Sequence, residues 1–177
     1  MTRFCDPLPD YSSRTTLILG CGNILRGDDG FGPEVITYLK DHFHLAEDVA
    51  LVDAGTGVNE VLLDVALSEP KPRRIVIVDA MENGLPAGTV SSFSLDQICP
   101  KEIRAFSAHQ VPTSSLLREL KELCNVDITV VTVQPGNIPQ EVQLGLSPAV
   151  RKSLPEACRL IATELLGSST SGDKSAV

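Results

Sequence analysis

Apolar residues recur along the chain with two periods, and together these periods predict alternating strands and helices. Runs without polar alternation, rich in β-branched residues, predict buried strands over 15–19, 49–52, 74–79 and 127–133. Apolar residues at helical spacing predict helices beginning near 31, 58, 113 and 148, and a partial alternation predicts an edge strand over 89–94. We therefore expect an α/β protein, a three-layer α/β/α sandwich around a mostly parallel twisted sheet of about five strands.

This pattern occupies the middle of the chain and predicts one domain. Residues 1–13 contain two prolines and predict an irregular lead-in. Residues 14–167 carry all the periodic segments and predict a single α/β domain. Residues 168–177 are rich in Ser and predict a disordered tail.

Composition excludes several classes of function. The 177 residues carry a formal net charge of -8 without clustered Lys or Arg, which argues against nucleic acid as a partner. No apolar run approaches the length of about 18 residues that a membrane span needs, and the first residues lack the apolar region of a signal peptide. Five scattered cysteines without a Cys-x-x-Cys pair are typical of a reducing compartment. We therefore expect a cytoplasmic protein.

The glycine-rich segment 20–34 follows the first predicted strand and precedes a helix. Ligand sites of α/β folds lie in such loops, at the carboxyl ends of the strands. The segment is not a dinucleotide fingerprint, because Leu25 stands where that motif needs its third glycine. It is not a phosphate loop either, because Gly27-Asp28-Asp29 replaces Gly-Lys-Ser/Thr, and paired carboxylates repel phosphate. The loop is suited to a cation or to a polar, neutral group.

Three carboxylates, Asp29, Asp53 and Asp79, follow predicted strands, so we expect them to converge on one crevice. His109 lies in a polar loop. If that loop folds over the crevice, Asp29, Asp79 and His109 offer two oxygens and one nitrogen to a divalent cation, with a position left for water or substrate. The structural alternative is that such carboxylates cap helices or staple loops. Asp28 is the expected helix cap, and Asp53 is the expected turn residue.

Cys21 has two interpretations. With His109 as base and Asp53 as orienting group it could act as an activated thiol nucleophile. Flanked by Gly20 and Gly22, it could equally be a small packing residue.

Five segments, in this order, resemble the maturation endopeptidases of nickel-iron hydrogenases. The resemblance covers about residues 15–166 and is carried by Gly20–Gly32, Val52–Thr56, Ile75–Ala80, Gly84–Gly88 and Ser107–Gln110. It implies an aspartyl-type endopeptidase that removes the C-terminal extension of a hydrogenase large-subunit precursor after nickel insertion. The Gly27–Gly30 loop and the Val133–Pro135 strand end are closer to members that serve multi-subunit hydrogenases, including archaeal deazaflavin-reducing ones.

By motif, the nickel-recognising residues of the family fall on Asp29, Asp79 and His109. The family's first acidic residue can be Glu, so Asp28 remains an alternative to Asp29. We expect nickel to arrive with the precursor, no permanently bound cofactor, assistance from Asp53 in catalysis, and a monomer or weak homo-oligomer. A non-catalytic nickel checkpoint and a thiol hydrolase using Cys21 are the alternative functions.

Overall fold

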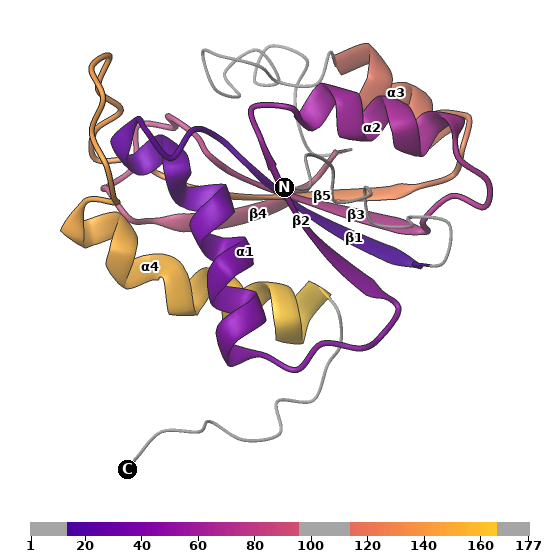
Figure 1. Ribbon diagram of the computed structural model, residues 1–177, viewed down its shortest axis with the longest axis horizontal. Helices are drawn as coiled ribbons and strands as arrows, with labels where there is room; N and C mark the ends of the chain where they lie inside the picture. Colours follow the sequence, from indigo (N-terminus) through magenta and orange to yellow (C-terminus); the bar gives the residue numbers. More distant parts are fainter. Residues whose placement is uncertain (1–13, 96–113, 166–177) are drawn as a thin grey trace, which may run out of the picture.

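The computed structural model describes residues 14–95 and 114–165, and these residues form one sheet covered by helices on both faces (Figure 1). The sheet has the order β2-β1-β3-β5-β4, in which β4 alone runs antiparallel to its neighbour. The strands are β1 Thr16–Cys21, β2 Val49–Gly55, β3 Arg74–Ala80, β4 Val90–Ser94 and β5 Asp127–Val133. The predicted fold class is confirmed, although β1 and β2 extend two or more residues beyond their expected ends.

Four α-helices and two shorter helical segments complete the described fold. The helices are α1 Phe31–His42, α2 Val58–Leu67, α3 Ser114–Glu122 and α4 Pro148–Arg159, with the 3-10 turn η2 Gly27–Gly30 and the π-helical segment η5 Leu160–Leu165. Figure 1 shows α1 and α4 on one face of the sheet and α2 and α3 on the other. The expected lead-in 1–13, the tail 168–177 and His109 lie outside the described residues.

Each face of the sheet buries its own apolar cluster. Alternate residues of the central strands, such as Leu19 and Ile77, pack against Leu62 of α2 and Leu120 of α3. The intervening residues pack against α1 and α4. Because both faces are covered, the strand sequences are apolar throughout, which is the pattern from which they were predicted.

Two glycines bring α1 close to β1 at the carboxyl edge of the sheet. A Cβ atom on Gly20 would lie 2.5 Å from the carbonyl oxygen of Gly32, and a Cβ on Gly32 would lie 2.3 Å from that of Cys21. Since no side chain fits between the two backbones, the helix can begin directly beside the strand end. This contact fixes the short loop between them, which carries the two adjacent aspartates.

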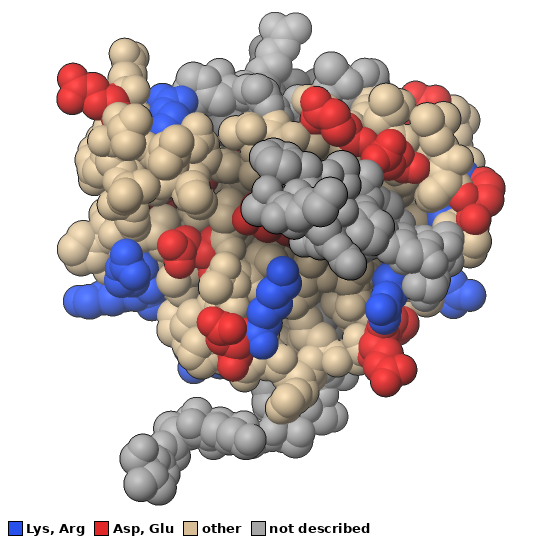
Figure 2. Space-filling model, in the orientation of Figure 1, with Lys and Arg blue, Asp and Glu red and all other residues tan. Residues whose placement is uncertain are grey.

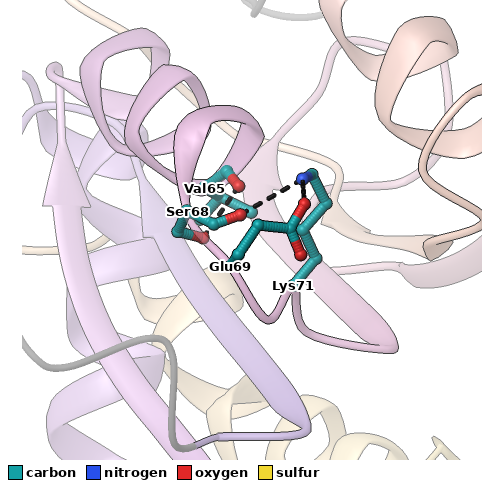
Figure 3. A network of polar contacts seen from close by, with 4 residues as sticks. All are labelled: Val65, Ser68, Glu69 and Lys71. Carbon is teal, nitrogen blue, oxygen red and sulfur yellow. Dashed lines mark hydrogen bonds and ion pairs between the residues drawn. The ribbon is translucent and has the colours of Figure 1, made fainter.

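A small polar network closes the turn between α2 and β3 at the opposite edge (Figure 3). Ser68 Oγ donates to the carbonyl of Val65 at 2.9 Å, and Lys71 Nζ donates to the carbonyl of Ser68 at 3.1 Å. Lys71 also pairs with Glu69. These contacts satisfy the last carbonyls of the helix, and they lie far from the strand ends that carry the aspartates.

The surface carries mixed charge. On the face shown in Figure 2, Lys and Arg side chains lie singly among Asp and Glu side chains and form no continuous basic patch. Within the part of the chain that the structure describes, no helix has the length and apolar character needed to cross a membrane.

Candidate active site

The loop between β1 and α1 buries both of its aspartates. Asp29 is 2% exposed, and its Oδ2 accepts a hydrogen bond from the backbone N–H of Asn23 at 3.0 Å. Gly22 makes this fold possible: it has φ +117°, and a Cβ there would lie 1.8 Å from the carbonyl oxygen of Asp29. Only glycine combines that backbone angle with so close an approach. The loop therefore turns the carboxylate of Asp29 back over the end of β1.

Asp79 lies at the carboxyl end of the neighbouring strand β3 and is 6% exposed. Its Oδ1 accepts a hydrogen bond from the N–H of Ala80 at 2.8 Å. Burial raises the pKa of the Asp79 carboxyl to about 7; the bond from Ala80 opposes this rise, and the charge of Asp29 adds to it. Asp29 and Asp79 therefore form a buried carboxylate pair whose full ionisation is disfavoured without a positive charge between them.

The described residues supply only two groups of the expected cation site. Within 14–95 and 114–165, no three His, Cys, Asp or Glu side chains gather in a way that could hold a metal ion. His109, the third expected ligand, lies outside these ranges. Two buried carboxylates, one in the η2 turn and one near the end of β3, suit a cation that brings some of its own ligands.

Asp53 is placed differently from the buried pair. Like Asp79 in β3, it lies within its strand, but it is exposed, and its Oδ1 accepts a hydrogen bond from the N–H of Gly55 at 3.1 Å. This local contact is the turn-forming role considered above. Asp53 still lies in the surroundings of Cys21, because its charge and that of Asp79 both raise the pKa of that thiol.

Cys21 is the last residue of β1 and is 4% exposed. Burial raises the pKa of its thiol well above the usual range, and the charges of Asp79 and Asp53 raise it further. A nucleophilic cysteine needs the opposite environment, one that stabilises the thiolate. The surroundings of Cys21 therefore favour the packing interpretation over the nucleophile.

Asp28 braces three segments and does not cap α1, so that expectation is wrong. Fully buried, it accepts hydrogen bonds from the N–H groups of Gly136, Asn137 and Ser147 at 2.8, 3.1 and 2.6 Å, and from Ser147 Oγ at 2.9 Å. The residue before α1 is Gly30, and no side chain caps that helix. With its oxygens occupied in this way, Asp28 has little left to offer a cation, which favours Asp29 as the acidic ligand.

Gln134 is a site residue that the sequence did not reveal. It follows β5 and is 3% exposed; its Oε1 accepts from the N–H groups of Asn83 and Leu85 at 2.7 and 3.2 Å, and its Nε2 donates to Glu82 at 2.8 Å. The side chain thus holds the loop that follows Asp79. The one signal for this role is an amide residue directly after a buried strand, in the Val133–Pro135 segment that entered above only through its resemblance.

Comparison with known proteins finds the family that the sequence motifs resemble. A family model described as hydrogenase maturation protease matches residues 33–164. The chain is 37% identical over 153 residues to the coenzyme F420 hydrogenase subunit delta of Methanothermobacter thermautotrophicus, covering 84% of this chain and 93% of that protein.

Solved structures agree with the fold and with the family. The hydrogenase maturating endopeptidase HybD from E. coli superposes with a TM-score of 0.71 at 26% identity, over 85% of this chain and 91% of that one. The NiFe hydrogenase maturation protease HycI from Thermococcus kodakarensis gives a TM-score of 0.65 at 26% identity, over 88% and 94%. With the family model covering well over half of its length, this chain is a peptidase of the hydrogenase maturation protease family.

Proposed function

We propose that this peptidase removes the C-terminal extension of the large-subunit precursor of a nickel-iron hydrogenase after nickel has been inserted. The observation that carries the proposal is the buried pair formed by Asp29, in the η2 turn after β1, and Asp79, near the end of the neighbouring strand β3. Two interacting carboxylates in an apolar setting repel each other, and a cation bound between them would offset that repulsion.

Nickel bound to the precursor supplies the positive charge that this pair lacks. Asp29 and Asp79 each offer a carboxylate oxygen, and His109 is proposed as the third ligand from this chain. A precursor without nickel would leave the two carboxylates facing each other and would bind poorly. The metal would then be the specificity determinant, and the protein would carry no permanent cofactor.

The chemistry required is hydrolysis of one peptide bond. Nickel near the scissile carbonyl would polarise it, and a water would attack the carbonyl carbon. A carboxylate of the site accepts the proton that the water loses, and the departing amine takes up a proton as the bond breaks. Asp53, exposed at the same edge, is placed to orient the peptide or the water.

An exposed apolar surface beside the pair supports a protein substrate. Ile24, Leu25, Val142 and Leu144, together called the apolar rim, are between 45% and 74% exposed. Two backbone hydrogen bonds join the loops that carry them, from Gly27 to Gln143 at 2.7 Å and from Gln143 to Leu25 at 2.8 Å. Adjacent exposed apolar side chains are typical of a surface that contacts another chain, and this one adjoins the loop of Asp29.

The relative from Methanothermobacter favours one class of hydrogenase. That protein is named as a subunit of a coenzyme F420 hydrogenase, and it matches over 84% of this chain. Coenzyme F420 is a deazaflavin, so the name agrees with the subgroup that the loop and strand-end residues resemble. We propose the large subunit of a coenzyme F420-reducing hydrogenase as the substrate.

The test is the intact mass of the nickel-loaded and nickel-free precursor after incubation with this protein. Loss of a C-terminal peptide from the loaded form alone is the expected result. The Asp79→Asn variant should leave the loaded precursor intact, whereas Asp64→Asn, an exposed aspartate on α2, should cleave it as the wild type does. Binding of the loaded precursor without any loss of mass would favour the checkpoint function and overturn the proposal.

A further inference from the structure

One buried hydroxyl group in the described part of the chain has no hydrogen-bond partner. It is Oγ1 of Thr132, on β5, in a residue that is 1% exposed. An unpaired buried hydroxyl costs free energy, whereas Val, of the same shape, would fill the position without that cost. The hydroxyl therefore calls for an explanation other than packing.

Thr132 lies directly beside Asp79. The two residues are paired in register on the parallel strands β3 and β5, so their side chains point to the same face of the sheet. That face is the one covered by α2 and α3, because Ile77 and Val130, two positions earlier, pack in the cluster of those helices. Neighbouring strands are about 4.8 Å apart, so the hydroxyl belongs to the immediate surroundings of the carboxylate.

When the Asp79 carboxylate binds a cation, a further hydrogen-bond donor would fix its orientation. Its Oδ1 accepts a bond from Ala80, a local contact that fixes one oxygen against the backbone. Carboxylates that ligate metals are generally oriented by additional hydrogen bonds to protein groups. In the free protein no acceptor meets the geometry of a hydrogen bond to this hydroxyl. A change in the side-chain rotamer of Asp79 or Thr132, without movement of the strands, would bring the hydroxyl and the carboxylate together.

We propose that Thr132 is a positioning residue for Asp79: its hydroxyl donates a hydrogen bond to the Asp79 carboxylate when the nickel-bearing precursor is bound. The inference rests on the proposed function and adds a residue to that site. In the free protein the hydroxyl has no hydrogen-bond partner. When the substrate binds, the Asp79 carboxylate becomes its acceptor. Thr132 touches neither the metal nor the peptide, so its effect passes through Asp79 alone.

The test compares Thr132→Val, which removes the hydroxyl and keeps the shape, with Thr132→Ser, which keeps the hydroxyl. Thr129→Val is the matched control, because Thr129 lies on the same strand, half-buried, and pairs with Val76 rather than with Asp79. Thermal unfolding of the free protein should show Thr132→Val at least as stable as the wild type. Its affinity for the nickel-loaded precursor should fall about tenfold, while binding of the nickel-free precursor stays unchanged.

Two further variants test whether the hydroxyl itself is required and whether it acts through Asp79. Thr132→Ser should recover most of the affinity and of the cleavage rate, and Thr129→Val should match the wild type. In the Asp79→Asn background, Thr132→Val should have no further effect on binding, because the hydroxyl acts through that carboxylate. Equal loss in the Val and Ser variants, or full affinity in the Val variant, overturns the inference.

These outcomes are separate from failure of the proposed function. A wild-type protein that leaves the nickel-loaded precursor uncleaved overturns the proposed function and this inference with it. A wild-type protein that cleaves, together with a Thr132→Val variant that binds and cleaves equally well, overturns the inference alone.

Discussion

Asp28 and Ser147 are 119 residues apart in sequence and are joined by two hydrogen bonds, from Ser147 N to Oδ1 at 2.6 Å and from Ser147 Oγ to Oδ2 at 2.9 Å. Ser147 is also the residue that precedes α4. Through this one carboxylate, the loop of Asp29 is fastened to the start of a helix from the far end of the chain. The position of Asp29 thus depends on the hydrogen bonds of the neighbouring Asp28.

Substitution of Asp28 by Asn should destabilise the protein strongly. The amide keeps one acceptor oxygen, but its NH₂ group would face N–H donors that now bond to the carboxylate, so buried donors are left unpaired. We expect a loss of about 2–4 kcal/mol in the free energy of unfolding, measured by urea denaturation.

The exposed Asp53 provides the comparison for that measurement. Asp53→Asn should change the free energy of unfolding by no more than about 0.5 kcal/mol, as surface substitutions usually do. Similar stability of the two variants would contradict the bracing role of Asp28.

The contrast between Asp28 and Asp79 shows what could be predicted from the sequence. The run Ile75–Val78 is apolar and β-branched without interruption, so a buried strand could be expected, and its end placed Asp79 at the carboxyl edge beside Asp29. Both steps need only local pattern and the rules of parallel sheets.

The role of Asp28 could not be predicted in this way. Its partners Gly136, Asn137 and Ser147 are 108 to 119 residues away, and an aspartate before a helix is locally indistinguishable from a helix cap. Gln134 was missed for the same reason, since its partners Asn83 and Leu85 lie about 50 residues earlier. Such contacts are fixed by packing of the whole fold, which no local pattern encodes.

Asp79 should make stability depend on pH in a direction opposite to that of most carboxylates. Its pKa is about 7 in the folded protein and near the ordinary 3.8 when unfolded. The fold therefore favours the protonated form: the contribution of Asp79 to stability is full below pH 3.8 and is lost as the pH rises toward 7. The loss amounts to at most about 1.4 kcal/mol per pH unit in that range.

The Asp79→Asn variant isolates this contribution, because the amide does not titrate. The free energy of unfolding of the variant minus that of the wild type should be larger at pH 8 than at pH 5. Urea denaturation of both proteins at both pH values measures this difference. Asp64→Asn should track the wild type at both. If the difference between Asp79→Asn and the wild type is the same at pH 5 and pH 8, Asp79 is not held in an environment that disfavours its charge.

Removal of the Cys21 thiol should leave cleavage intact. The thiol is buried and its pKa is raised, so it holds no thiolate to attack a peptide bond. Cys21→Ala should lower stability by about 1–2 kcal/mol, as expected when a small buried group is removed, and should process the nickel-loaded precursor at a rate close to that of the wild type.

Cys158→Ala is the control for that experiment, because Cys158 is fully buried on the opposite face of the sheet. The two variants should lose similar stability and keep similar cleavage rates. Complete loss of cleavage in Cys21→Ala alone would restore the thiol hydrolase as the mechanism.

The apolar rim should contribute to substrate binding and hardly at all to folding. Val142 and Leu144 are 74% and 73% exposed, so replacing both by Ser removes little buried area from the free protein. The double variant should therefore unfold at nearly the wild-type temperature. If the precursor covers these side chains, the KM for the nickel-loaded form should rise about tenfold, a cost of about 1.4 kcal/mol that is typical of losing good interface contacts, with kcat little changed.

Leu67 and Leu123 supply the matched control, because each is 77% exposed and both lie at the ends of helices that lead into the opposite edge of the sheet. Their double replacement by Ser removes a similar exposed apolar area away from Asp29 and Asp79, so the KM should stay at the wild-type value. Equal effects of the two double variants would mean that the loss follows general surface polarity. An effect confined to Val142 and Leu144 would show that the precursor lies across the loop that presents Asp29.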